Sequence, residues 1–168
     1  MVFVFFSNLE NARPLSAIIF IIAALTDWLD GWVAREFDQT SKLGAFLDPV
    51  ADKLIVCIAL LIIVQSDPSI INTLVSIVII GREISISALR EWMAELGERH
   101  QVSVIAFSKL KTILQMAGLS CMLYKETLLG LDIYSIGMIS LIVASILTVW
   151  TMLIYLAKAW PYLQGGMD

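Results

Sequence analysis

The sequence contains few of the residues that build disulfides, zinc sites or basic surfaces. It has two cysteines, Cys57 and Cys121, and both lie in apolar segments without a C-x-x-C pair or a companion histidine. We therefore expect buried thiols and no disulfide or zinc site. His100 is the single histidine, stands in a polar segment, and is not expected to bind metal. The formal net charge of −4 argues against a nucleic-acid partner.

The first apolar segment is also short. Residues 1–6, MVFVFF, are apolar, but a bilayer-spanning helix takes about 20 residues. No basic segment precedes them, so a signal peptide is a poor fit. They are expected to be the end of a helix whose beginning is absent. We expect residues 1–168 to form a single membrane-embedded domain with a truncated N-terminus.

Apolar residues, by contrast, are abundant. They make up 59% of the chain, and the mean hydropathy is +0.86. Both values predict an integral membrane protein. The fold class is expected to be all-α, a polytopic transmembrane helix bundle with five full helices and an N-terminal stub of a sixth. The helices are predicted near residues 14–35, 41–65, 70–92, 102–124 and 135–157.

The distribution of lysine and arginine predicts the orientation of these helices, because such residues collect on the cytoplasmic side. Only Arg13 and Lys125 lie toward one side of the predicted membrane. Nine basic residues lie on or toward the other side, namely Arg35, Lys42, Lys53, Arg82, Arg90, Arg99, Lys109, Lys111 and Lys158. We therefore expect the polar segment 36–42, and the carboxylates beside it, to face the cytoplasm.

Four aspartates flank that polar segment, at the edges of two long apolar runs. Asp27 and Asp30 share one helical stripe with Gly31 and Ala34, at spacings of three, four and seven residues. Gly44, Asp48 and Asp52 form a second stripe on the next helix, at spacings of four and eight.

If the two stripes face each other, four carboxylates surround one small space. Their repulsion would be severe without a cation, and oxygen ligands select hard cations such as Mg²⁺, Mn²⁺ or Ca²⁺. The small residues in the stripes would leave room for a bulky ligand. The alternative is that these aspartates are solvated helix caps. That alternative could explain Asp38 and Asp48 but not Asp27 and Asp30, which end an apolar run and face a helix C-terminus unfavourably.

The complete pattern resembles the signature of the CDP-alcohol phosphotransferases. The pattern is D-x-x-D-G-x-x-A-R, eight residues, then G-x-x-x-D-x-x-x-D, and it is filled by Asp27, Asp30, Gly31, Ala34, Arg35, Gly44, Asp48 and Asp52. The resemblance implies that the four aspartates bind Mg²⁺ or Mn²⁺ and that Asp52 is also the general base. It further implies that Gly31, Ala34, Arg35 and Gly44 bind the CDP group.

A second set of basic residues follows downstream. Arg82 comes after a long apolar run, and a buried arginine needs an acidic or phosphate partner. That partner could be a phosphate, or an acid near Glu83 or in the signature. Lys109 and Lys111 point about 200° apart on one helix, so both cannot line one cavity equally. Thr112 and Gln115 could support whichever lysine faces inward.

The segments GREISISALREWMAELG and SKLKT resemble the branch of the family that uses glycerol 3-phosphate. The resemblance implies transfer of a phosphatidyl group from CDP-diacylglycerol to sn-glycerol 3-phosphate, with release of CMP. It implies acceptor-phosphate binding by Arg82, Arg90 and Lys109 or Lys111. It also implies a homodimer in the bacterial inner membrane, with its active site facing the cytoplasm.

Two other functions remain open from the sequence. A sister enzyme could use the same signature with inositol phosphate, serine or a phospholipid such as phosphatidylglycerol as acceptor. A cation transporter could also place acidic residues in helices. Transporter sites tend to lie near the membrane midplane, whereas these aspartates are predicted near one interface.

Overall fold

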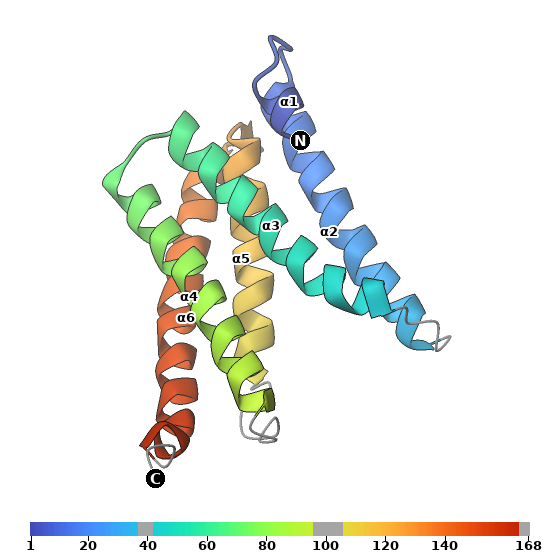
Figure 1. Cartoon of the computed structure of the whole chain (residues 1–168). Coiled ribbons are helices and arrows are strands. Elements are labelled where there is room, and N and C mark those ends of the chain that lie inside the picture. The colour runs from blue at the N-terminus through green and yellow to red at the C-terminus, as the bar shows by residue number, and fades with distance from the viewer. Residues whose placement is uncertain (37–41, 96–105, 165–168) are drawn as a thin grey trace.

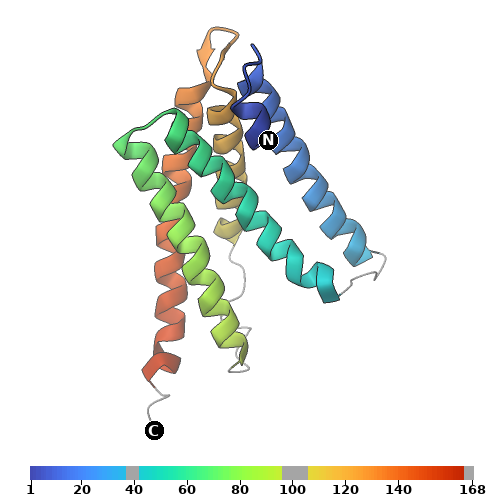
Figure 2. The same cartoon turned by 45° about the horizontal axis from the view of Figure 1, so that its top comes forward.

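The computed structural model describes the backbone of residues 1–36, 42–95 and 106–164, together with most of the side chains in those ranges. The side chains of residues 27–28, 30–36, 42–49, 106–109, 161 and 163–164 are outside this description. Five long helices alternate in direction (Figures 1 and 2), namely α2 (Ala12–Glu36), α3 (Lys42–Ser66), α4 (Ile70–Glu95), α5 (Ala106–Tyr124) and α6 (Ile133–Gln164). A four-residue helix, α1 (Val2–Phe5), precedes them and packs against α2.

The lengths of these helices, 19 to 32 residues, suit a bilayer. Within the described ranges, length and composition together mark two candidate spans, α4 and Ile133–Trp160 of α6, and a shorter apolar stretch, Ala12–Thr26. Many large apolar side chains point outward, including Ile22, Leu61 and Ile146, which are 57%, 61% and 64% exposed. Such a surface is unfavourable in water and suits lipid. The architecture is therefore that of an all-α helical membrane protein, as expected.

The helix bounds agree with the predicted ranges except at a few ends. The largest difference is at α6, which continues to Gln164, well beyond the predicted end at residue 157. Pro161 in the extra turns disfavours a helix, but Tyr155 and Ala159 are fully buried in a small cluster with Ile86 and Met93 of α4. Packing against α4 therefore supports the helix beyond the apolar run from which its end was predicted.

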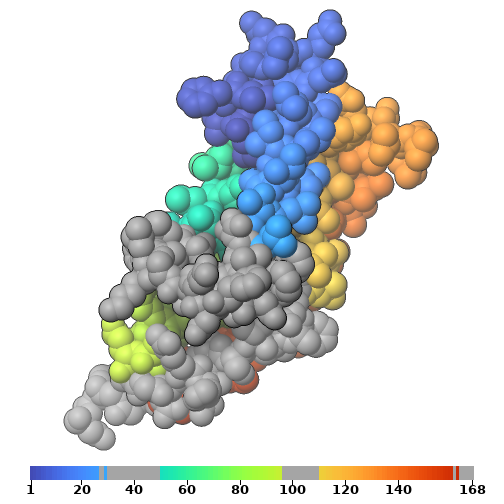
Figure 3. All heavy atoms as spheres, turned by 90° about the vertical axis from the view of Figure 1, so that its right-hand side faces the viewer, coloured from blue at the N-terminus to red at the C-terminus, as the bar shows by residue number. Residues whose placement is uncertain are grey.

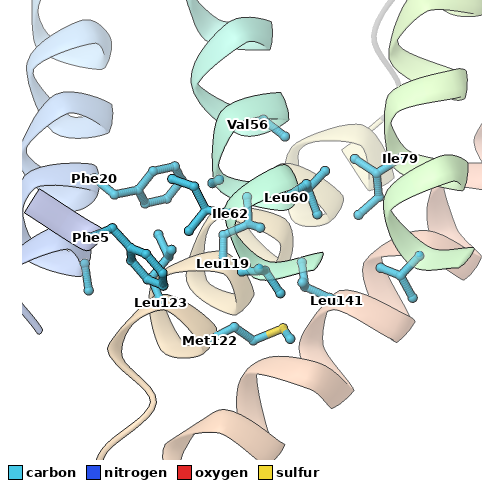
Figure 4. Packing of buried hydrophobic residues seen from close by; sticks show 14 residues of the cluster. Phe5, Phe20, Val56, Leu60, Ile62, Ile79, Leu119, Met122, Leu123 and Leu141 are labelled. Atoms are coloured by element: carbon cyan, nitrogen blue, oxygen red, sulfur yellow. The ribbon is translucent and has the colours of Figure 1, made fainter. Parts of the chain in front are cut away.

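One main cluster of buried apolar side chains joins all six helices. Figure 4 shows Phe5 of α1 and Phe20 of α2 directed toward Ile62, Leu119 and Leu123 of α3 and α5. Leu60, Ile79 and Leu141 extend the cluster to α4 and α6. This core lies toward the end of the bundle where α3 and α5 finish.

A two-stranded hairpin, which the sequence did not predict, connects α5 and α6. Its strands are β1 (Thr127–Leu128) and β2 (Leu131–Asp132), antiparallel, with Thr127 opposite Asp132 and Leu128 opposite Leu131. Leu129 and Gly130 form the turn with φ of 53° and 80°, the left-handed conformation that tight hairpins require. Figure 3 shows the hairpin, in orange, projecting near the same end of the molecule as the blue N-terminal residues. We call this end the hairpin end.

Asp132 connects the hairpin to α6 by capping that helix. Its Oδ1 accepts hydrogen bonds from the backbone N–H groups of Tyr134 and Ser135, and its Oδ2 accepts one from the Ser135 hydroxyl at 2.5 Å. These hydrogen bonds, first of all the one from the Ser135 hydroxyl, lower the pKa of the Asp132 carboxyl. The cap therefore fixes where α6 begins.

An ion-pair cluster ties the helices together at the hairpin end. Asp67 lies between α3 and α4, and its carboxylate accepts a hydrogen bond from Arg13 Nη1 of α2 at 3.0 Å. The same carboxylate forms an ion pair with Lys125, which precedes the hairpin. The buried Asn72 donates to the Asp67 carbonyl at 2.6 Å and to the Tyr134 hydroxyl at 2.9 Å. Arg13 and Lys125, the two basic residues predicted on the minority side, therefore share one acidic partner.

The backbones of α5 and α6 approach closely where two glycines face each other. A Cβ atom added at Gly137 would lie 2.8 Å from the Gly118 carbonyl oxygen and 2.8 Å from Cys121 Cβ. One added at Gly118 would lie 2.9 Å from Leu141 Cγ. Small residues allow this kind of helix contact in membranes.

We expect Gly137→Ala to lower the free energy of unfolding by roughly 1–3 kcal/mol, because the added methyl group forces α5 and α6 apart. The measurement is thermal unfolding of the detergent-solubilised protein. Gly81→Ala in α4 is the matched control, since nothing lies within 4 Å of a Cβ there, and alanine favours a helix. Equal melting temperatures for Gly137→Ala and the native protein would contradict the close contact.

Candidate active site

A cavity of about 500 Å³ opens between α3, α4 and α5, in the half of the bundle away from the hairpin end. We call this half the signature end, because α2 ends and α3 begins there (Figure 1). The lining residues are Asp52, Lys53 and Val56 of α3, Arg82, Glu83, Ile86, Ser87, Arg90 and Glu91 of α4, and Lys111, Thr112, Gln115 and Met116 of α5.

Helical spacing explains why these residues share the cavity. On α4, Arg82, Ile86 and Arg90 recur every four residues, and Glu83, Ser87 and Glu91 do the same one position later. Lys111 and Gln115 repeat the spacing on α5. The helix that resembles the acceptor-binding segment thus directs a polar face toward α3 and α5.

The deep part of the cavity contains two buried cations that share one carboxylate. Arg82 Nη1 lies 2.7 Å from Glu83 Oε1, and Lys111 Nζ lies 3.0 Å from the same oxygen. The side chains of Arg82 and Lys111 are only 6% and 4% exposed. Among these three described side chains, one negative charge is set against two positive charges, so the trio has a net positive charge that favours an anion.

Two buried polar atoms in the cavity wall have no hydrogen-bond partner within the described ranges. They are Arg82 Nε, a donor on α4, and Gln115 Oε1, an acceptor on α5. Buried polar atoms in proteins are nearly always paired. A donor and an acceptor left over in one cavity are suited to a ligand that is anionic in one part and carries a hydroxyl in another.

The remaining basic residues differ in position. Arg90 is exposed at the outer part of the cavity, about 12 Å along α4 from Arg82. Its guanidinium carbon lies 5.8 Å from the centre of the Tyr155 ring, so part of its role is packing against α6. Lys111 lines the cavity, whereas the side chain of Lys109 lies outside the described residues.

The structure places the signature residues on two successive helices. Asp27, Asp30, Gly31, Ala34 and Arg35 lie in the C-terminal part of α2. Gly44, Asp48 and Asp52 lie in the N-terminal part of α3. Except for Asp52, their side chains are outside the described residues, so the predicted facing of the two stripes stays a prediction.

Asp52 is the one signature carboxylate that the structure places in detail. It is exposed and lines the cavity that also contains Arg82 and Lys111. Among the described side chains no group of three potential metal ligands occurs, and that set includes one of the four aspartates. Carboxylates are suitable ligands for a divalent cation. The exposed carboxylate of Asp52 lines the cavity, and the other three signature aspartates lie on the same pair of helix ends.

Sequence reasoning considered Glu83 only as one ion-pair partner of Arg82. The structure shows that Glu83 also binds Lys111, which lies 28 positions away in the sequence. No local spacing could reveal this contact, since it depends on how α4 packs beside α5. Gln115 was named only as a support for a lysine. Its position four residues after Lys111 was the signal that it shares the same face.

Comparison with known proteins finds a family and relatives that are similar to this chain. The sequence model of the family described as CDP-alcohol phosphatidyltransferase matches residues 1–153. A protein from Wigglesworthia glossinidia brevipalpis is 51% identical over 159 residues, covering 95% of this chain and 86% of the relative. Relatives from Haemophilus influenzae and Salmonella choleraesuis are 46% and 45% identical over 94% and 95% of this chain, covering 84% and 86% of their own lengths. All three relatives are named CDP-diacylglycerol–glycerol-3-phosphate 3-phosphatidyltransferase.

Proposed function

Because this chain belongs to the CDP-alcohol phosphatidyltransferase family, we propose that it transfers the phosphatidyl group of CDP-diacylglycerol to sn-glycerol 3-phosphate. Relatives that are 45–51% identical over most of the chain carry the name of that reaction. The structural observation that supports the acceptor is the pair of buried cations, Arg82 and Lys111, that share one carboxylate in the cavity of Asp52. Fixed positive charge beside a catalytic carboxylate suits an alcohol that carries a phosphate.

The chemistry assigned to the cavity is one displacement at phosphorus. A hydroxyl oxygen of glycerol 3-phosphate attacks the phosphorus that bears the diacylglycerol group, and the bond from that phosphorus to the oxygen of CMP breaks. The hydroxyl proton passes to Asp52, the general base, and CMP departs. The products are phosphatidylglycerophosphate and CMP.

The residues of the chain bind and orient the two substrates for this step. Arg82 and Lys111 hold the acceptor phosphate, with Arg90 or Lys109 as further candidates nearer the signature end. Glu83 keeps the two buried cations together, because its Oε1 lies 2.7 Å from Arg82 Nη1 and 3.0 Å from Lys111 Nζ. Gly31, Ala34 and Gly44 leave space for the CDP group, and Arg35 adds positive charge beside it.

The signature also supports a divalent cation, Mg²⁺ or Mn²⁺, as cofactor. Asp27, Asp30, Asp48 and Asp52 are the residues that would hold it, because all four are carboxylates on the adjoining ends of α2 and α3. When bound, the cation supplies positive charge against the pyrophosphate.

The location in the cell is part of the same proposal. The cavity lies at the end to which nine of eleven basic residues were assigned, which supports an active site facing the cytoplasm. The family resemblance supports the bacterial inner membrane, a homodimer and one domain over residues 1–168. The buried cluster that links α1 to α6 also supports the single domain.

The proposed function is tested by CMP release in sealed membrane vesicles supplied with CDP-diacylglycerol and Mg²⁺. Glycerol 3-phosphate is expected to support release, whereas inositol phosphate, serine and phosphatidylglycerol are not. Inverted vesicles should use externally added glycerol 3-phosphate, and right-side-out vesicles should not. Faster release with another alcohol would reassign the acceptor, and activity confined to right-side-out vesicles would reverse the orientation.

A further inference from the structure

We propose that Gln115 binds a hydroxyl group of the acceptor that does not attack phosphorus, and thereby selects a polyol phosphate over a phosphate ester with a single hydroxyl. This inference rests on the proposed function of the cavity. Gln115 is 4% exposed, lines the cavity, and its Oε1 has no hydrogen-bond partner in the described part of the chain.

The unpartnered oxygen is the first reason for this assignment. A buried acceptor without a donor is destabilising, and apolar side chains such as Val56, Ile86 and Met116 line the same cavity. A further apolar residue at position 115 would remove that cost. The glutamine is therefore better explained by a donor that arrives with a ligand.

The position of Gln115 relative to the cations is the second reason. Lys111 and Gln115 lie one helical turn apart on α5, about 6 Å along the axis. Arg82 and Lys111 supply the positive region for a phosphate, and Gln115 is a neutral side chain directly beyond it. A small molecule with a phosphate at one end and hydroxyls along a short carbon chain can touch both.

The chemistry of the amide matches a hydroxyl rather than a second anion. A primary amide offers a carbonyl acceptor and N–H donors, whereas a hydroxyl donates one hydrogen bond and accepts others. A second anionic group would leave Oε1 unpaired and face a carbonyl dipole. A hydroxyl satisfies the oxygen and adds no charge to the cavity.

The test compares two acceptors that differ by this hydroxyl. Glycerol 3-phosphate carries it, whereas 3-hydroxypropyl phosphate retains the phosphate and the attacking hydroxyl but lacks the middle one. The full-length enzyme with CDP-diacylglycerol and Mg²⁺ is expected to prefer glycerol 3-phosphate by about tenfold or more in kcat/KM. In Gln115→Met, a change of similar size without the amide, the preference should fall to within about twofold, mostly through slower use of glycerol 3-phosphate.

Two further variants keep the test decisive. Gln115→Glu retains an acceptor oxygen and should retain the preference, because its added negative charge affects both phosphate-bearing acceptors alike. Ser120→Ala removes a polar group from α5 outside the cavity, where the hydroxyl donates to the Met116 carbonyl at 2.8 Å. It should leave the preference unchanged.

An active Gln115→Met enzyme with the native preference would overturn this inference and leave the proposed function standing. If Gln115→Met does not fold, loss of the preference in Gln115→Glu would overturn it equally. Absence of CMP release from the native protein with glycerol 3-phosphate would instead show that the proposed function is wrong. The two failures are therefore distinguishable.

Discussion

Asp52→Asn is expected to lower kcat for CMP release by about 10²–10⁴-fold, the usual contribution of a general base. Asp52 is exposed on α3 and lines the cavity of the buried cations. Asparagine preserves its size and removes its ability to take a proton. Because the side chain is exposed and not part of the apolar core, the variant should still fold.

The measurement is the steady-state rate against Mg²⁺ concentration, after excess chelator has abolished activity and added metal has restored it. If Asp52 served only as a metal ligand, high Mg²⁺ would recover the rate of Asp52→Asn. A general base predicts that the loss persists at saturating metal. Glu95→Gln, a carboxylate at the end of α4 outside the cavity lining, is the control and should retain native turnover. Full native activity in excess chelator would disprove the metal requirement.

Arg82→Lys is expected to raise the KM for glycerol 3-phosphate by about ten- to a hundredfold, with little change in the KM for CDP-diacylglycerol. Lysine keeps the charge but loses the planar set of donors that fits phosphate. Losing a charge-assisted hydrogen bond typically costs about 1.5–3 kcal/mol. The Nε of Arg82, which has no hydrogen-bond partner among the described residues, is the donor whose loss should matter most, since Nη1 already binds Glu83.

If Arg82 had only a structural role, Arg82→Lys would give a different result. Its ion pair with Glu83 would then weaken, and the variant would unfold at a lower temperature with an unchanged KM for glycerol 3-phosphate. Arg13→Lys is a matched control, because Arg13 also pairs with an acid, Asp67, but at the hairpin end. It should affect unfolding alone. An equal effect of both substitutions on KM would show that the acceptor site depends on general stability.

The fold could be predicted because long apolar runs are bounded by polar segments. The helix predicted at residues 70–92 corresponds to α4, Ile70–Glu95, and the helix predicted at residues 41–65 corresponds to α3, Lys42–Ser66. The hairpin at residues 127–132 could not be predicted, since it depends on a leucine, Leu129, in a left-handed conformation. The extension of α6 depends on contact with α4, which hydropathy does not record.

The site could be predicted only where local spacing determines it. The aspartate stripes follow from helical periodicity and stay a prediction, whereas the predicted support of an inward lysine by Gln115 agrees with the cavity that Lys111 and Gln115 both line. The bridge from Glu83 to both Arg82 and Lys111 could not be predicted, because it joins helices through tertiary packing. The position of Lys111 in the cavity depends on the orientation of α5, and the side chain of Lys109 lies outside the described residues, so the choice between the two lysines stays open.

The glycine contact between α5 and α6 also limits how the cavity could be redesigned. Gly118 and Gly137 allow the two helices to lie in close contact, because a Cβ atom at either position would lie 2.8–3.0 Å from atoms of the other helix. The α5 wall, with Lys111 and Gln115, is therefore a fixed reference surface. Room for a bulkier alcohol would have to come from shorter side chains on α3 and α4 or from movement of those two helices. A library intended to change the acceptor should thus vary positions 56, 86 and 87 and keep both glycines.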